Sequence, residues 1–308
     1  MGGRMRFKGL DLNLLVALDI LLSEKNVSRA ADRLCLSQSA TSGALARLRD
    51  YFGDDLLTQV GRQMVLTPRA SELSDKVRST LMQIDRTILR SPDFTPRTAE
   101  RRIRIIASDY ATLTGLQRPL QEISRQAPLL QFEIQGPGAD PQACLERGDV
   151  ELMLMPEPCR AKGHPSVALF RDDYVVVAAR GNSWLGEAIS TEEFFAAEHV
   201  VARFPTFRPT FETWFVENHA ESRRIACEAE SFLAMPYLVA HTDRIALMHR
   251  RLAGTFASAL DLRILPAPVA IPPLTEHLQW HVQSGSDDCL SWVRERIVAA
   301  HAPEACAA

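Results

Sequence analysis

The chain has 308 residues and a net charge of −3, with 46% hydrophobic and 24% charged residues. This length predicts two or more domains, because one domain usually spans about 100–200 residues. We find no apolar run of about 18 residues, and polar residues interrupt the stretch Leu12–Leu22, so neither a transmembrane helix nor a signal peptide is expected. The six cysteines form no Cys-x-x-Cys pair and no metal-ligand spacing, which indicates free thiols in a reducing cytoplasm.

Charge is distributed unevenly along the chain. Residues 1–90 hold 14 basic and 10 acidic residues, a net charge of +4. The rest of the chain holds 21 basic and 28 acidic residues, a net charge of −7. This asymmetry is typical of a protein in which one domain contacts phosphate and another does not.

After a first apolar helix near Leu12–Leu22, residues 27–51 have the pattern of two short helices at a tight turn. Ser28 and Ser37 are the predicted N-caps, with Val27 as a staple residue. The predicted inner faces are Ala30, Ala31 and Leu34 in the first helix and Ala40, Ala44, Leu45 and Leu48 in the second. A helix with small polar residues at its start and arginines further on suits a DNA major groove.

The outer face of the second helix supplies most of the predicted DNA contacts, and Arg33 of the first helix and Arg62 of the hairpin that follows at 56–66 supply the others. Ser37 begins this helix, and the residues expected at base edges are Gln38, Ser39, Thr41 and Ser42. The residues expected at phosphates are Arg33, Arg47, Arg49 and Arg62. Taken alone, the segment is also compatible with a surface helical hairpin carrying solvated arginines.

Residues 56–90 predict a small hairpin followed by a long helix. Leu56–Val60 and Met64–Leu66 flank Gly61-Arg62-Gln63 as a wing, and Thr67-Pro68 has the residues of a helix start. The helix carries one apolar stripe, formed by Ala70, Leu73, Val77, Leu81, Ile84 and Ile88. The stripe predicts a homodimer through this helix, although packing on its own domain would need the same pattern.

Three segments resemble the N-terminal domain of LysR-type transcriptional regulators: DLNLLVALDILL (11–22), SRAADRLCLSQSATSGALARLRDYFGDDLL (28–57) and VLTPRA (65–70). The DLNLL opening, RLRDYF and TPRA are similar to the branch that holds NodD-like nodulation regulators and salicylate- and nitroaromatic-responsive regulators. The chain has Ser39 where this family usually has Pro, and Leu57 and Gln59 where Phe and Arg are common. These departures leave the motif intact but prevent a transfer of operator preference.

The resemblance implies a winged helix-turn-helix domain at 1–67, with its helix-turn-helix at about 27–46, and a dimerisation helix at 68–90. Residues 91–99 have two prolines, polar residues and no periodicity, which predicts a linker. It further implies an activator that binds double-stranded promoter DNA, forms a homotetramer and contacts RNA polymerase. The implied effector is a small aromatic compound, such as a flavonoid, a salicylate-like acid or a chlorinated or nitrated phenol. No cofactor is expected.

Beyond the linker, strand and helix patterns alternate, which predicts an α/β fold. The first strands are expected at 102–108, 130–135 and 150–155, separated by helices at 113–126 and 141–147, so this part is a βαβαβ unit with parallel strands. Later strands are expected at 174–179, 199–202, 225–229, 245–248, 262–265 and 276–282, and later helices at 209–219, 232–241, 250–256 and 287–300.

By resemblance, residues 100–303 form a two-lobed effector-binding domain similar to periplasmic binding proteins. Lobe I is expected at 100–160 and 275–303, and lobe II at 166–270. Two proline-rich segments, 155–165 and 266–273, are the predicted crossings between the lobes.

The candidate effector residues lie at strand ends. Ser108, Asp109 and Tyr110 follow the first strand and precede a helix, where polar groups suit an anionic or polar ligand, although capping of that helix explains them equally well. In the second lobe, the resemblance implies ligand contacts around His199–Arg203 and Ser231-Phe232. Arg203 is a suitable partner for a carboxylate or phenolate, and Phe204 offers an apolar wall.

No catalytic or metal site is expected. His277 and His281 would share one strand face but lack a third ligand, and the sequence holds no Gly-x-Ser-x-Gly, P-loop or Gly-x-Gly-x-x-Gly motif. The sequence therefore favours an effector-controlled transcriptional regulator. Two alternatives stay open: a small-molecule-binding protein whose N-terminal helices only dimerise, and an enzyme with a DNA-binding appendage.

Overall fold

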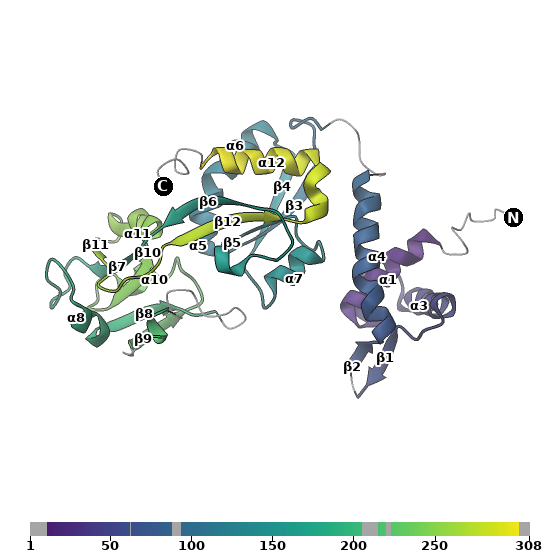
Figure 1. Ribbon diagram of the computed structural model, residues 1–308, viewed down its shortest axis with the longest axis horizontal. Coiled ribbons are helices and arrows are strands. Elements are labelled where there is room, and N and C mark those ends of the chain that lie inside the picture. Colours follow the sequence, from purple (N-terminus) through teal and green to yellow (C-terminus); the bar gives the residue numbers. More distant parts are fainter. Residues whose placement is uncertain (1–10, 62, 88–93, 205–214, 220–222, 302–308) are drawn as a thin grey trace. The chain divides into compact units, whose positions relative to one another are not determined.

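The computed structural model describes residues 11–61, 63–87, 94–204, 215–219 and 223–301. The chain divides into two compact units, Met1–Pro92 and Asp93–Ala308, which we describe separately (Figure 1). Among the described residues, no helix is both long enough and apolar enough to cross a bilayer.

The first unit is a winged helix-turn-helix. Its elements are α1 (Leu12–Glu24), α2 (Val27–Leu34), α3 (Gln38–Phe52), β1 (Leu57–Val60), β2 (Gln63–Leu66) and α4 (Pro68–Thr87). β1 and β2 pair as an antiparallel hairpin, which confirms the predicted wing. Leu18 and Leu21 of α1, Leu48 of α3 and Leu56 before the wing are fully buried in one shared core.

Two of the three predicted helix caps are confirmed. The Ser37 hydroxyl accepts from the Ala40 N–H at 3.2 Å, and the Thr67 hydroxyl accepts from the Ala70 N–H at 3.0 Å. The predicted Ser28 cap is wrong, because Asn26 accepts from the Arg29 N–H at 3.0 Å and starts α2 two residues earlier. Asparagine and serine are equally good caps, so the pattern alone did not distinguish them.

The buried face of α3 consists of Thr41, Ala44, Leu45 and Leu48. Ala40, predicted on this face, is exposed, and Thr41, predicted in the groove-facing set, is fully buried. Thr41 tolerates the core because its hydroxyl donates to the Ser37 carbonyl at 3.1 Å. A buried hydroxyl with a helix carbonyl as its partner is not available to DNA.

The stripe of α4 packs on its own unit over most of its described length. Ala70 and Val77 are buried in the core shared with α1 and α3, and Leu73 and Leu81 pack against it. Nε of the buried Arg78 donates to Oδ1 of Asp19 at 2.8 Å and ties α4 to α1. The stripe up to Leu81 therefore follows the alternative of intradomain packing and is not evidence for a dimer. Ile84 is partly buried, and Ile88 lies outside the described residues.

The second unit contains two five-stranded sheets, one in each lobe. In the lobe I sheet, β3 (Arg101–Ala107) is parallel to β4 (Leu130–Gln135) and β5 (Leu152–Pro156), which confirms the βαβαβ unit. The strands β12 (Leu274–Trp280) and β6 (Ser166–Asp172) complete the sheet in the order β4-β3-β5-β12-β6.

The helices of lobe I lie on both faces of this sheet. α6 (Gln117–Gln126) and α12 (Asp288–Ala299) lie side by side, as Figure 1 shows, while α7 (Pro141–Glu146) packs beneath β5. α6 is reached without interruption from α5 (Asp109–Ala111) through a π-helical turn at Thr112–Leu116. The helix thus begins directly after β3, four residues before its predicted start.

Lobe II has a sheet in the order β11-β7-β10-β8-β9. Its elements are β7 (Tyr174–Ala179), α8 (Thr191–Ala196), β8 (Glu198–Ala202), β9 (Arg224–Ala229), α10 (Met235–Val239), β10 (Ile245–His249), α11 (Arg250–Ala257) and β11 (Leu262–Pro266). Every strand expected here is present. Most of the helix predicted at 209–219 lies outside the described residues.

One of the two predicted crossings between the lobes is wrong. Segment 155–165 stays with lobe I, where the Gln279 amide exchanges two hydrogen bonds with the Ala161 backbone, at 2.8 and 2.7 Å. β6 still pairs in the lobe I sheet and β7 in the lobe II sheet, so the chain crosses at Asp173 and lobe II begins at Tyr174, not at 166. The return crossing lies between β11 and β12, at the predicted segment 266–273.

Candidate DNA-binding surface and effector site

The exposed face of α3 carries most of the predicted DNA contacts. Ser37, Gln38, Ser39, Ser42 and Arg47 are all exposed. The hydroxyls of Ser37 and Ser39 are 3.0 Å apart, so Ser37 keeps a polar neighbour while it caps the helix. These residues remain candidates for DNA contact, whereas Thr41 is not a candidate because its side chain is buried.

The four predicted phosphate-binding arginines differ in their surroundings. Nε and Nη2 of Arg49 donate to the carbonyls of Asp55 and Leu57, each at 2.8 Å, so this side chain is committed to the backbone that leads into the wing. Arg33 pairs with Glu24 at 2.8 Å. Arg47 makes no ion pair with a described residue, and Nε donates only weakly, at 3.4 Å, to a carbonyl of its own helix. Arg62 lies outside the described residues.

An aromatic cluster forms where the two lobes meet. The ring of Tyr110, on α5 of lobe I, stacks on His249 of lobe II with a centroid distance of 4.0 Å and an interplanar angle of 21°. Phe232 contacts Tyr110 edge-on at 6.1 Å, and Phe204 lies 5.2 Å from Phe232. We call Tyr110, Phe204, Phe232 and His249 the interlobe cluster.

Asp109 connects the lobes beside this cluster. Its Oδ2 accepts from the Ser231 hydroxyl at 2.7 Å and from the Leu233 N–H at 3.0 Å. Ser108 instead caps α5, because its hydroxyl accepts from the Ala111 N–H at 3.1 Å. Of the predicted trio, Asp109 and Tyr110 reach the other lobe and Ser108 has the structural role.

Two buried carboxyl groups lie next to the cluster. The Tyr110 hydroxyl donates to Asp172 at 2.8 Å, and Asp172 also accepts from the Arg251 N–H. Burial and the neighbouring Asp172 raise the pKa of Glu276 to about 8, and its Oε2 has no hydrogen-bond partner among the described residues. Burial also raises the pKa of Asp172 and lowers that of His249 to about 3. Glu276 therefore keeps its proton at neutral pH and can donate a hydrogen bond, while Asp109 and Asp172 offer acceptor oxygens.

Sequence reasoning missed Asp172, His249 and Glu276. A signal was available only for His249, which ends the apolar strand β10, because β6 and β12 carry other polar residues beside Asp172 and Glu276. A buried ionisable residue at such a place needs a partner or a function.

Two predicted effector residues lie elsewhere. His199 is fully buried in lobe II, where Nε2 is 2.6 Å from the Phe194 carbonyl and burial lowers its pKa to about 4. Arg203 pairs with Glu228 at 3.1 Å and Glu217 at 3.8 Å on the half-exposed surface. His199 is thus a core histidine on a central strand, and Arg203 already has acidic partners on the surface.

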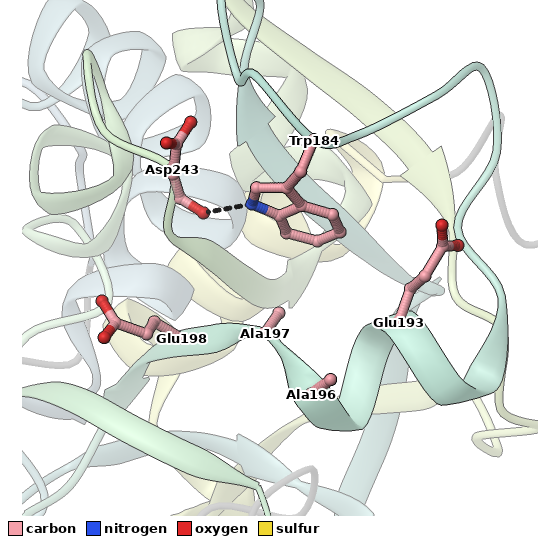
Figure 2. Close-up of a pocket in the computed structure, with 6 residues that line it drawn as sticks. All are labelled: Trp184, Glu193, Ala196, Ala197, Glu198 and Asp243. Carbon is pink, nitrogen blue, oxygen red and sulfur yellow. Dashed lines mark hydrogen bonds between the residues drawn. The ribbon is translucent and has the colours of Figure 1, made fainter.

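A separate cavity of about 310 Å³ lies in lobe II. It is lined by Trp184, Glu193, Ala196, Ala197, Glu198 and Asp243. Figure 2 shows the Trp184 ring between the two glutamates, with its N–H donated to the Asp243 carbonyl at 3.0 Å. Glu193 accepts from the Ser190 N–H and Glu198 pairs with Arg224, so both glutamates have intramolecular partners. No predicted effector residue lines this cavity.

The histidine pair does not form a metal site. His277 lies on β12, whereas His281 follows the strand and accepts from the Gln283 N–H through Nδ1 at 3.1 Å. Within the described ranges, no group of three or more His, Cys, Asp or Glu residues is arranged to hold a metal ion.

Both units of the chain are similar to known protein families. The family profile "Bacterial regulatory helix-turn-helix protein, lysR family" matches residues 12–71, and "LysR substrate binding domain" matches residues 96–302. The chain is 42% identical to Nodulation protein D 1 of Mesorhizobium japonicum, over 96% of this chain and 94% of that protein. It is 41% identical to Nodulation protein D 2 of Rhizobium tropici, over the same shares of both chains.

Solved structures share the architecture. A probable transcriptional regulator from Pseudomonas aeruginosa is 28% identical, with a TM-score of 0.63 over 95% of this chain and 97% of that one. Full-length OxyR from the same organism is 16% identical, with a TM-score of 0.71 over 94% of both chains, and shows the fold alone.

Proposed function

The chain belongs to the LysR family of DNA-binding transcriptional regulators, and from this membership we propose that it is an activator controlled by a small aromatic effector bound between lobes I and II. In this proposal α3 enters the major groove of double-stranded promoter DNA as the recognition helix. The protein works in the cytoplasm as a homodimer or homotetramer, with RNA polymerase as its partner, and catalyses no reaction. A solved structure that is 28% identical to the chain is likewise described as a probable transcriptional regulator.

The interlobe cluster supports the aromatic effector. Rings from both lobes converge there, so a planar ligand could stack where Tyr110 now meets His249 and Phe232. Asp109, Asp172 and Glu276 supply carboxyl oxygens beside these rings, and Arg203 is paired elsewhere. A ligand with phenolic hydroxyls, which can donate to Asp109 and Asp172, suits this environment better than an aromatic carboxylate, which would place a further carboxylate beside these two aspartates.

The effector proposal is tested by a thermal-shift screen of the full-length protein with phenols and with benzoates of matched ring substitution. We expect phenolic compounds to raise Tm through binding to the folded state. Phe232→Ala should abolish the shift, whereas Trp184→Ala, which removes an aromatic side chain from the separate lobe II cavity, should preserve it. Shifts with benzoates alone, or equal losses in both variants, would contradict the proposed site.

DNA binding is tested with the promoter region of the protein's own gene. Affinity should fall steeply as salt rises, because phosphate contacts release counterions. A protein whose N-terminal helices only dimerise would show no salt-dependent binding. An enzyme with a DNA-binding appendage would instead turn over the phenol that stabilises it.

A further inference from the structure

Gly43 lies in the interior of α3, six residues into a helix of 15. Glycine is unfavourable at such a position, because it loses more backbone entropy on folding than any other residue. An interior helix glycine therefore needs a reason, such as a special backbone angle or a close neighbour.

The part of the protein that the structure describes supplies no such reason. The backbone of Gly43 is not in the left-handed region, and a Cβ added there would meet nothing within 4 Å. Gly115, in the π-helical turn of lobe I, is the opposite case, because a Cβ there would lie 2.7 Å from Cδ2 of Leu154. Intramolecular packing explains the glycine at position 115 and leaves the one at 43 unexplained.

The position of Gly43 on the helix indicates what lies near it. The buried face of α3 is formed by Thr41, Ala44, Leu45 and Leu48, and at about 100° per residue Gly43 points away from it. Of the exposed residues around it, Ser39, Ser42 and Ala46 are also small, whereas Arg47, one turn further on, donates weakly from Nε to the Gly43 carbonyl at 3.4 Å. Position 43 therefore has no side chain of its own to separate the helix backbone from a molecule that contacts this face of α3.

We propose that Gly43 determines operator recognition: base edges in the major groove approach the α3 backbone so closely at this residue that a side chain cannot be accommodated. The inference rests on the proposed docking of α3 in DNA. Residues on either side then read bases at a depth that Gly43 sets, and phosphate contacts from Arg47 position the helix. Any long side chain at position 43 would hold α3 away from the groove floor.

The test is Gly43→Gln, with Gly254→Gln as its matched control. Gly254 is also an exposed helix glycine, in α11, with nothing within 4 Å of an added Cβ. Glutamine is a good helix former without charge, so each variant should raise the Tm of its own unit. Binding is measured on a duplex that the wild-type protein selects from a random library, and on a scrambled duplex.

We expect Gly43→Gln to lose roughly tenfold or more in affinity for the selected duplex, and about threefold or less for the scrambled one, since non-specific binding uses phosphates. Gly254→Gln should bind both like the wild type. Wild-type affinity of Gly43→Gln for the selected duplex, or equal losses on both duplexes, would overturn the inference.

Arg47→Ala separates this inference from the docking of α3. If Arg47→Ala weakens binding while Gly43→Gln does not, α3 docks in DNA but Gly43 is not the close-approach residue, and the inference is overturned. If both variants bind like the wild type, the docking of α3 is wrong, and the inference falls with it.

Discussion

Arg47 and Arg49 are two positions apart on α3 and have different surroundings. Arg47 is exposed without an ion pair among the described residues, whereas Arg49 donates to two carbonyls that precede and begin the wing. A guanidinium held by two backbone carbonyls fixes the position of the wing relative to α3. The first arginine is suited to phosphate, and the second to holding the domain together.

We predict that Arg47→Ala weakens binding to all duplexes alike and reduces the slope of log affinity against log salt by about 1, as expected for one lost phosphate contact. Arg49→Ala should instead lower the stability of the N-terminal unit by about 1–3 kcal/mol, because two carbonyls lose a charged donor. Salt-dependent binding and thermal unfolding of both variants measure the difference. If Arg49→Ala reduced the slope of log affinity against log salt and left the stability unchanged, Arg49 would be a DNA-contacting residue after all.

Glu276 gives the second unit a pH-dependent stability. Its pKa is about 8 in the folded protein, against an ordinary value of 4.5. Between these two values the folded state keeps a proton that the unfolded state has released. The contribution of the protonated carboxyl is therefore fully present below about pH 4.5 and is lost as the pH rises through about 8.

We predict that Glu276→Gln unfolds at a higher temperature than the wild type at pH 8.5, by several degrees, and that the difference shrinks towards pH 5. Calorimetry of the C-terminal unit across this range measures it. Glu187→Gln, a change at an exposed position, should follow the wild-type curve throughout. A constant offset between Glu276→Gln and the wild type would show that this carboxyl does not titrate in the window.

Which residues are exposed on α3 could be predicted from helical spacing, as Gln38, Ser39 and Ser42 illustrate. The prediction for Thr41 was wrong, because its hydroxyl donates to a carbonyl of its own helix and the side chain can therefore be buried. The roles of His199 and Arg203 could not be predicted, because their partners, Phe194 and the two glutamates Glu217 and Glu228, do not follow from strand periodicity.

At the scale of the element, the π-helical turn at Thr112–Leu116 depends on close packing. Gly115 lies against Leu154 of β5 and Phe170 of β6, at 2.7 and 3.2 Å from an added Cβ. The turn continues directly from α5, which carries Asp109 and Tyr110. The same packing that presses this turn on the sheet therefore positions two residues of the candidate effector site.

We predict that Gly115→Ala destabilises the C-terminal unit by about 1–3 kcal/mol, since an extra methyl group must displace core side chains. Gly254→Ala, where the added methyl meets open space, should instead stabilise the same unit slightly. Denaturant unfolding of the two variants checks the sign of each effect. Stabilisation by Gly115→Ala would mean that the turn has room to shift.

Hydrophobic periodicity predicted every strand of the second unit except β6, and the short α8 was also missed. β6 was not predicted because Ser166–Asp172 mixes apolar residues with Arg171 and Asp172. It forms a strand by pairing with β12, which is distant in sequence. The stripe on α4 was correct as a pattern, but periodicity cannot identify the surface against which a stripe packs.

At the scale of the whole second unit, the two lobes are joined by two chain crossings and by hydrogen bonds, which include those of Asp109 and the bond from the Arg251 N–H to Asp172. Asp109 holds Ser231 and the Leu233 N–H from the opposite lobe. The order of the lobes and the return of the chain to lobe I followed from the resemblance. The position of the first crossing could not be predicted in this way, because prolines indicate an extended backbone but not the sheet with which that backbone pairs.

We predict that Asp109→Ala speeds hydrogen exchange of the Leu233 amide by roughly tenfold or more, as its charged acceptor is removed. Asp109→Asn keeps one oxygen that can accept and should show a smaller increase. Mass spectrometry of the peptide that contains Ser231–Ala234 measures both variants. Unchanged exchange in Asp109→Ala would mean that Asp109 does not hold the lobes together in solution.

The strand order of lobe I has a consequence for how the protein is made. β12, which lies between β5 and β6, belongs to the last part of the chain, together with α12. A ribosome has therefore completed all of α1–α4 and the whole of lobe II before lobe I can close its sheet. The N-terminal unit can fold early in synthesis, whereas the sensor is finished last. A nascent chain that stops before β12 would carry the DNA-binding helices without a sensor to control them.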